Sequence, residues 1–242
     1  MVSPSETTEP VRNSDCVLVI MAKAPRPGMV KTRLIRSLPL EAVTLFYRCL
    51  LDDTLALARS LAGVEVAIMC PASDVDELAV LAGPGVRVVA QNGEGLAAGL
   101  TSVFARFAED QQRRIIAFNS DSPHLPPSVL EAAFEALVAH DLVIGPTYDG
   151  GYYLVGANGV HPSLFIRDGM GTGSALENLL SQARVLELSA GFTDPFYDID
   201  VADDLIQLAA ELEDFPAKAP RTAFWLKEWG DAITRLRTGT TD

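Results

Sequence analysis

The sequence predicts an α/β protein with a Rossmann-like, three-layer α/β/α arrangement around a mostly parallel, mixed sheet. Short apolar runs alternate with longer amphipathic segments along the chain, which is typical of repeated β-α units. The first run, Cys16–Met21, is apolar throughout, as expected of a strand buried on both faces of a parallel sheet. The 242 residues, 48% of them hydrophobic, suffice for one substantial core.

The expected elements follow one another at regular spacing. After the strand Cys16–Met21 we expect helices at Leu40–Leu61, Asp74–Leu81, Leu96–Asp110, Ser174–Gln182 and Ala202–Leu212, with one more starting at Pro126–Ser128. The further strands are expected at Val64–Met69, Arg87–Ala90, Arg114–Asn119, Leu142–Gly145, Gly151–Gly156 and Val185–Leu188. Ser128 with Glu131, and Ser174 with Glu177, have the spacing of capping boxes.

Composition divides the chain into three parts. Residues 1–15 are rich in Ser, Thr, Glu and Pro and are expected to be disordered. Residues 16–215 form the expected single domain, and residues 216–242 form a helical tail in which Trp225 and Trp229, one turn apart, are expected to pack onto the core.

Charge and hydropathy exclude several classes of function. The net charge of −13 argues against nucleic acid as a partner, because such a partner requires a basic face. No apolar run approaches the roughly 18 residues of a membrane span, and the N-terminus lacks a basic-then-apolar leader pattern, so a cytoplasmic location is expected.

The segment after the first strand concentrates positive charge in an otherwise acidic chain. Four cations, two of them Lys31 and Arg33, lie within the eleven residues that begin at Lys23. Because ligands of open parallel sheets bind beyond the carboxyl ends of strands, we expect Ala22–Arg33 to bind nucleotide phosphates, with Gly28 allowing close approach of the backbone. A merely solvated basic loop is the alternative. The segment is not a Walker A loop, which needs a glycine directly before the lysine.

A second glycine-rich segment follows the strand Arg87–Ala90. Gly93, Gly95 and Gly99 resemble a dinucleotide-binding fingerprint, but their spacing is one residue too long. We expect Gly93 and Gly95 to cradle a base or ribose.

A carboxylate follows the strand that ends at Asn119. Asn119, Ser120 and Asp121 form an oxygen-rich group at the expected ligand edge of the sheet. Mg²⁺ or Mn²⁺ is held in such places by one or two carboxylates and the phosphates of a nucleotide, so Asp121 is a candidate metal ligand. Alternatively, Asp121 only caps the turn before Pro123.

Two further acidic segments complete the candidate site. Asp149 lies in an Asp-Gly-Gly turn between two strands, where hairpin chemistry alone could explain it. Asp198 and Asp200 lie on one side of an extended segment by the two-residue period, and a helix cap together with a second metal ligand would use both.

The histidines and cysteines do not suggest covalent catalysis. His124, His140 and His161 are far apart and are expected at turns or helix ends, on the surface or as caps, and the three cysteines are expected to be buried, reduced thiols. The chemistry expected is metal-assisted transfer.

Four blocks together resemble a known family. They are the Lys-x-Pro-x-Pro-Gly-x-x-Lys-Thr-Arg-Leu loop from Lys23, the Ser-Asp-Ser-Pro-x-Leu-Pro segment from Ser120, the Gly-Pro-x-x-Asp-Gly-Gly-Tyr-Tyr-Leu-x-Gly hairpin from Gly145, and Asp-Ile-Asp at Asp198. In this order they resemble the small bacterial glycosyltransferase-like family with the GT-A fold, formerly described only as a domain of unknown function.

The resemblance implies roles for individual residues. This family is similar to nucleotide-diphospho-sugar transferases and, more distantly, to 2-phospholactate guanylyltransferase and the molybdenum-cofactor nucleotidyltransferases. It implies that Lys23, Lys31 and Arg33 contact nucleotide phosphates, that Asp121 and Asp200 hold the metal, and that Asp149 faces the acceptor or the sugar as a catalytic residue.

The sequence therefore favours a metal-dependent transferase with a nucleotide-activated donor. Sugar transfer from a nucleotide-diphospho-sugar to a small acceptor is the leading hypothesis. Nucleotidyl transfer from a nucleoside triphosphate to a small phosphorylated or carboxylated metabolite is the alternative, and the departure of Gly93-Glu94-Gly95-Leu96-Ala97-Ala98 from the Gly-Asp-Leu-Gly-Glu-Arg segment common in the family points toward it. A nucleotide-binding protein without turnover is a third class. The sequence leaves open the base, the sugar, the acceptor, the stereochemical outcome and the oligomeric state.

Overall fold

The computed structural model describes residues 15–108, 113–165 and 174–238. Residues 1–15 were expected to be disordered, and all of them except Asp15 lie outside the described residues. The glycine-rich stretch Gly169–Gly173 also lies outside them. None of the described helices is both long and apolar enough to cross a membrane.

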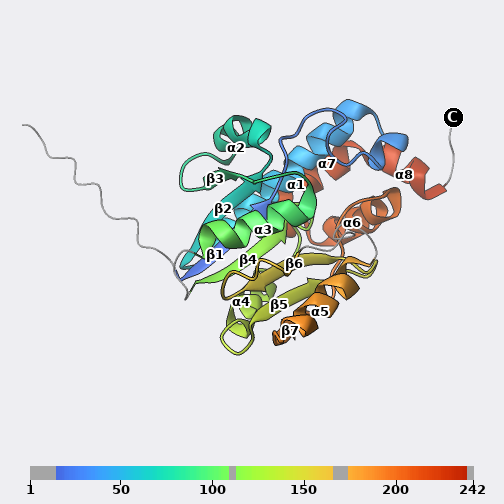
Figure 1. Cartoon of the computed structure of the whole chain (residues 1–242). Coiled ribbons are helices and arrows are strands. Elements are labelled where there is room, and N and C mark those ends of the chain that lie inside the picture. Colours follow the sequence, from blue (N-terminus) through green and yellow to red (C-terminus); the bar gives the residue numbers. More distant parts are fainter. Residues whose placement is uncertain (1–14, 109–112, 166–173, 239–242) are drawn as a thin grey trace, which may run out of the picture.

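Seven strands form one sheet in the order β3-β2-β1-β4-β6-β5-β7. Their bounds are β1 Cys16–Met21, β2 Val64–Cys70, β3 Arg87–Ala90, β4 Arg114–Asn119, β5 Leu142–Pro146, β6 Tyr152–Ala157 and β7 Ala190–Phe192. β6 runs antiparallel to both of its neighbours, and all other pairs are parallel. This arrangement, drawn in Figure 1, confirms the predicted mostly parallel, mixed sheet.

Helices cover both faces of the sheet because its strands are apolar on both sides. In β1, Leu18 and Ile20 pack with the core residues of α1, α2 and α4, whereas Val17 and Val19 pack with those of α3 and α5. The bounds of these helices are α1 Leu40–Ser60, α2 Val75–Ala82, α3 Gly95–Phe107, α4 Pro127–Ala136 and α5 Ala175–Val185. The predicted three layers are therefore confirmed.

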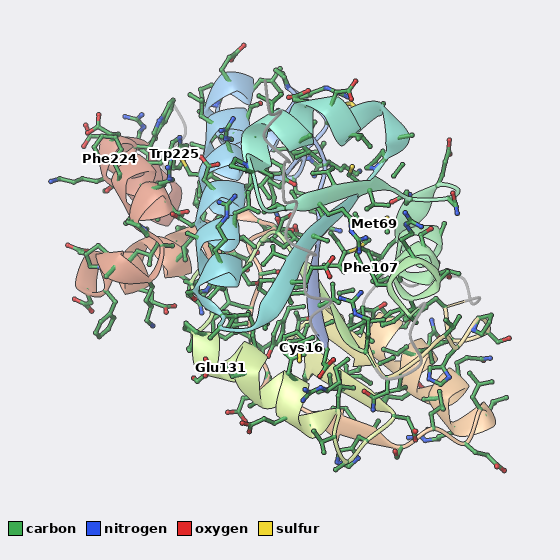
Figure 2. All side chains as sticks on the ribbon, turned by 90° about the vertical axis from the view of Figure 1, so that its left-hand side faces the viewer. Cys16, Met69, Phe107, Glu131, Phe224 and Trp225 are labelled. Carbon is green, nitrogen blue, oxygen red and sulfur yellow. The ribbon has the colours of Figure 1, made fainter. Side chains whose placement is uncertain are left out.

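The C-terminal helices build a third core cluster against α1. These helices are α6 Ala202–Asp214, α7 Pro220–Glu228 and α8 Gly230–Thr238. Elsewhere in the described chain, short 3₁₀ segments lie at Leu34–Arg36, Ala72–Asp74 and Pro216–Lys218. Trp225, which Figure 2 shows on a helix beside the long α1, lies 4.7 Å from Phe46 between ring centroids and stacks on Trp229 at 5.5 Å. Asp53 of α1 accepts hydrogen bonds from the first turn of α7. The expected packing of the tryptophans onto the core is confirmed for Trp225, which is 5% exposed.

Three local predictions are wrong. Val185 ends α5, and the last strand comes five residues later, because Glu187 adopts a left-handed backbone with φ of 56° that turns the chain. Neither predicted capping box forms. Proline at the first position fixes the start of α4, which leaves Ser128 inside the helix, and Ser174 makes no side-chain cap to α5.

The strand order creates a crevice at the edge where the site was expected. β1 lies between β2 and β4: from β1 the chain passes through α1 to β2 on one side of it, whereas from β3 it passes through α3, on the opposite face of the sheet, to β4 on the other side. Because β1, β2, β3 and β4 are parallel, their carboxyl ends meet at one edge. Ligands of open α/β sheets bind at such switch points.

Candidate functional site

A cleft of about 1070 Å³ opens at the carboxyl edge of the sheet. The segments after β1, β2, β3 and β4 line it, together with Tyr47 of α1 and one residue from the segment before α6. Nine of the predicted site residues lie along this cleft, namely Ala22, Lys23, Lys31, Arg33, Gly93, Gly95, Ser120, Asp121 and Asp200. Chain segments separated by more than a hundred residues thus share one concave surface.

Lys31 joins two of the predicted metal ligands. Its Nζ lies 2.8 Å from Oδ2 of Asp121 and 2.9 Å from Oδ1 of Asp200, and its side chain is 4% exposed. Burial alone would lower the pKa of this ammonium group, but the two carboxylates outweigh burial and raise the pKa above its ordinary value. The group is therefore a permanent cation in the centre of the site.

Asp198 completes a cluster of three carboxylates. One oxygen each from Asp121, Asp198 and Asp200 lies within 4.8 Å of the other two. Hard oxygen ligands at such separations fit Mg²⁺ or Mn²⁺, which coordinate carboxylates, phosphates and water. The period-two spacing of Asp198 and Asp200 signalled the pair, but it did not distinguish ligand from cap. The capping role belongs to Asp204, which accepts hydrogen bonds from the backbone N–H groups of Asp200 and Val201.

The cluster carries an excess of negative charge that affects Asp198 most. Burial raises the pKa of Asp198 to about 6, with Asp121, Asp200 and Asp149 adding to the rise and Lys31 opposing it. The pKa of Asp200 moves the other way. Burial would raise it, but the charges of Lys31 and Arg33 lower it below its ordinary value. The Nη1 atom of Arg33 lies 3.2 Å from Asp200.

Buried hydrogen bonds position the loop after β1 against the loop after β4. The hydroxyl of Tyr47 accepts a hydrogen bond from the backbone N–H of Lys23 at 3.1 Å and lies 3.2 Å from the hydroxyl of Ser120. Burial and the nearby Asp121 raise the pKa of Tyr47 to about 12, so the phenol stays neutral. This contact connects the cation-rich loop to the carboxylate side of the cleft.

The glycines after β3 adopt backbone conformations that other residues avoid. Gly93 has a φ of 83° and Gly95 one of 81°, and both line the cleft that Lys31 and Arg33 also line. Left-handed φ values favour glycine because it has no Cβ. The segment thus presents bare backbone to the cleft, in line with the predicted contact to a base or ribose.

Asp149 lies at the tip of the β5–β6 hairpin and does not line the cleft. Its Oδ1 accepts hydrogen bonds from the hydroxyl of Thr147 and the N–H of Gly151, the turn chemistry considered as its alternative explanation. Its charge nevertheless contributes to the raised pKa of Asp198. Its Oδ2 forms no hydrogen bond with the described part of the chain.

Three other residues of the predicted loops lie apart from the cleft. Gly28 has a φ of 75°, so glycine is required there by the turn. Asn119 donates to the hydroxyl of Ser122. Arg26 pairs with Asp74 at 2.7 Å and with Glu77 at 2.9 Å, which holds the outer part of the loop onto α2.

His124 was expected at the surface or as a cap, but it is buried because the chain folds over it. It is 1% exposed, its ring lies 4.8 Å from that of Phe196 and 4.6 Å from that of Tyr197, and neither ring nitrogen has a hydrogen-bond partner in the described residues. Burial lowers the pKa of His124 to about 4, although Glu211, with an oxygen 4.0 Å from Nε2, opposes this. A neutral histidine therefore supports the segment that carries Asp198.

The cysteines are free, as expected, but only Cys70 is fully buried, while Cys16 and Cys49 are partly exposed.

Comparison with known proteins finds a similar family for the middle of the chain. Residues 54–172 match the family described as "Uncharacterized protein conserved in bacteria (DUF2064)". The match covers just under half of the chain. The matched residues run from α1 through β6 and include Gly93, Asp121 and Asp149, whereas the Lys23–Arg33 loop and Asp200 lie outside.

Solved structures share the fold over nearly the whole chain. A protein of Desulfovibrio desulfuricans G20, described as a candidate nucleotide-diphospho-sugar transferase, is 25% identical with a TM-score of 0.84, over 92% of this chain and 98% of that one. The 4-diphosphocytidyl-2C-methyl-D-erythritol synthase of Anaerococcus prevotii is 13% identical with a TM-score of 0.57, over 83% and 97%.

A nucleotidyl transferase of Methanothermobacter thermautotroptrophicus is 18% identical with a TM-score of 0.57, over 83% of this chain and 98% of that chain. These last two show the fold alone. No protein of curated function matches the chain significantly.

Proposed function

We propose that this protein is a metal-dependent transferase that moves a sugar from a nucleotide-diphospho-sugar to a small acceptor. The observation that carries the proposal is that Asp121 and Asp200 meet Lys31 and Arg33 in one cleft at the switch point of the sheet, with Asp198 beside them. The likeness to the candidate nucleotide-diphospho-sugar transferase of Desulfovibrio desulfuricans, with its TM-score of 0.84, supports the same class.

The diphosphate of the donor would lie along Lys31 and Arg33. Asp121 and Asp200, with Asp198, would hold Mg²⁺ or Mn²⁺, which when bound neutralises charge that develops on the leaving diphosphate. Lys31 and Arg33 would contribute to the same end, since fixed cations beside a leaving group stabilise the transition state in a site shielded from water. The bare backbone at Gly93 and Gly95 would face the base or ribose.

The acceptor would approach from the β5–β6 hairpin. The free Oδ2 of Asp149 is held in place because Oδ1 is fixed by two hydrogen bonds in the turn. That oxygen is the proposed acceptor for the proton of the attacking hydroxyl group. Tyr148 beside it is 76% exposed, with its hydroxyl donating to the carbonyl of Pro195, and its ring face is available to a sugar or another ring.

Nucleotidyl transfer from a nucleoside triphosphate is the second candidate. The same cations and carboxylates would then act on the bond between the α- and β-phosphates, with a phosphate or carboxylate of the acceptor as nucleophile. The segment after β3 supports this candidate, because two glycines with left-handed φ values line the cleft where the base is expected.

A donor panel separates the candidates. The full chain is incubated with Mn²⁺ and, separately, nucleoside triphosphates and nucleotide-diphospho-sugars of each common base, while thermal stability and released products are followed. The proposal predicts stabilisation by nucleotide-diphospho-sugars and slow release of nucleoside diphosphate with free sugar. Release of pyrophosphate from a triphosphate in the presence of small acceptors would instead establish nucleotidyl transfer. Binding without turnover under all conditions would support a non-catalytic nucleotide-binding protein.

A further inference from the structure

We propose that Lys31 is an exchangeable counter-ion, which occupies the cation position among the aspartates in the free protein and moves to the diphosphate when a divalent ion binds. This inference rests on the metal centre of the proposed function. It concerns the chain's own lysine and the order in which charges enter the site.

The geometry shows that the ammonium group stands where a metal would stand. Oδ2 of Asp121 and Oδ1 of Asp200, at 2.8 and 2.9 Å from Nζ, belong to two of the three carboxylates that approach within 4.8 Å of one another. An ammonium group that is 4% exposed and contacts both carboxylates already balances part of their charge. The cluster therefore holds together without a metal.

The two cations exclude each other at these oxygens. Mg²⁺ lies about 2.1 Å from its carboxylate ligands, so an ion on the same two oxygens would lie within roughly 3 Å of an unmoved Nζ. At that separation, like charges repel by several kcal/mol even at an effective dielectric constant of about 20. The ion can enter only as Nζ leaves.

Lys31 has a destination within the same cleft. Its side chain is a flexible four-carbon stem with a point charge, and its neighbours from Met29 to Arg33 all line the cleft. When Nζ leaves Asp121 and Asp200, it stays beside the position proposed for the phosphates. Arg33 keeps its contact to Asp200 during the exchange. Nucleotide binding and metal binding are then coupled, because each favours the same movement of Lys31.

For a single substitution, the exchange predicts changes of opposite sign in the affinity for Mn²⁺ and in the affinity for nucleotide. Lys31→Met removes the competing cation and keeps the length of the stem, so it should raise the affinity for Mn²⁺ alone about tenfold while it weakens nucleotide binding. A lysine that served only the phosphates would weaken nucleotide binding and leave the affinity for Mn²⁺ alone unchanged. The matched control is Lys23→Met, in the same loop, because the Lys23 side chain is exposed and forms no ion pair within the described residues.

The experiment measures Mn²⁺ binding to the full chain by calorimetry, for the wild type and both variants. Amine acylation of the wild type, followed by mass spectrometry, adds a measurement that needs no substitution. We expect Lys31 to be protected without metal and labelled once Mn²⁺ saturates the site, while the exposed Lys227 on α7 is labelled equally in both states. The change for Lys23→Met should stay within about twofold, since exposed charges are screened over about 10 Å.

Two results would overturn the exchange and leave the proposed metal centre intact. They are Mn²⁺ binding to the wild type with no gain in the folded Lys31→Met variant, and protection of Lys31 that persists at saturating Mn²⁺. Failure of all three proteins to bind Mn²⁺, with or without nucleotide, would overturn the metal centre and the exchange together. The donor panel without metal then tests the transferase proposal separately.

Discussion

The two edges of the same sheet both carry ion pairs, but their charges balance differently. At the amino edge, Glu65 of β2 lies 2.9 Å from Arg87 of β3 and also pairs with Arg113, which precedes β4. Arg87 also lies over the ring of Phe107, 4.5 Å from its centroid. These three charged groups therefore have partners within the described part of the chain.

The carboxyl edge has more negative than positive charge. Three aspartates converge there, while Lys31 and Arg33 are the cations that pair with them. Burial raises the pKa of Asp198, and the neighbouring carboxylates add to the rise. The comparison teaches that ion pairs as such do not indicate function. A cluster of carboxylates that outnumbers its paired cations beside a cleft does, because it leaves a position for a further cation.

The largest expected effect is the loss of chemistry at the carboxyl edge. Asp121→Asn removes a carboxylate of the cluster with little change in shape, so transferase turnover should fall about 1000-fold, or about 4 kcal/mol in the activation barrier. Steady-state kinetics with the donor found in the panel, together with calorimetry of Mn²⁺, provide the measurement. Full Mn²⁺-dependent affinity in this variant would contradict the metal assignment. Glu65→Gln is the control at the other edge and should leave Mn²⁺ affinity unchanged.

The same Glu65→Gln substitution should lower the stability of the protein. It removes the carboxylate that pairs with the guanidinium of Arg113, whose side chain is 9% exposed, and with that of Arg87. Removing one partner of a largely buried ion pair costs about 3 kcal/mol in the free energy of unfolding. Urea unfolding followed by circular dichroism gives this value. A wild-type stability for the variant would mean that the amino edge is not held by this pair.

Acid should lower the free energy of unfolding through the carboxyl edge more than through the amino edge, because His124 lies buried in the segment after β4. The buried ring has its pKa lowered to about 4, whereas an unfolded histidine titrates near pH 6.5, so the unfolded state binds more protons between these values. Stability from this group is present above pH 6.5 and is lost as the pH falls toward 4. From pH 7.5 to pH 5 the loss should be about 2 kcal/mol.

The variant His124→Phe isolates this contribution. Phenylalanine keeps a ring against Phe196 and Tyr197 but cannot titrate, so any packing cost applies equally at both pH values. Urea unfolding at pH 7.5 and pH 5 should show a smaller pH dependence in the variant than in the wild type. Equal dependence in both proteins would exclude His124 as the source.

The smallest effect is expected for Arg26, within the same loop as Lys31. Its guanidinium is held at the surface by Asp74 and Glu77, so it is not available to phosphates. Arg26→Gln should lower the melting temperature less than Glu65→Gln does, because exposed ion pairs stabilise little. It should leave nucleotide affinity within twofold of wild type, in contrast to Arg33→Gln. Equal losses for the two variants would show that the whole loop acts as one phosphate site.

Local pattern in the sequence was sufficient for the fold and for the edge at which the site lies. The apolar runs gave strands in the expected places because residues buried on both faces must be apolar throughout. Cations after β1 and carboxylates after β4 could be assigned to one edge, since parallel strands end together. The strand expected at Val185–Leu188 failed because a short apolar run does not distinguish the end of a helix from a strand.

By itself, the sequence determined that a parallel sheet would present Lys31, Arg33 and Asp121 at a common edge. Only the tertiary structure decided their partners. Lys31 and Asp200 are 169 residues apart, so no local spacing indicates that the lysine meets the aspartates before it meets a phosphate. The burial of His124 and the choice of Asp204 as the cap depended likewise on how distant segments pack. Long-range ion pairs and burial depend on which distant segments pack together in the folded chain. The periodicity of apolar residues along the sequence does not specify that packing.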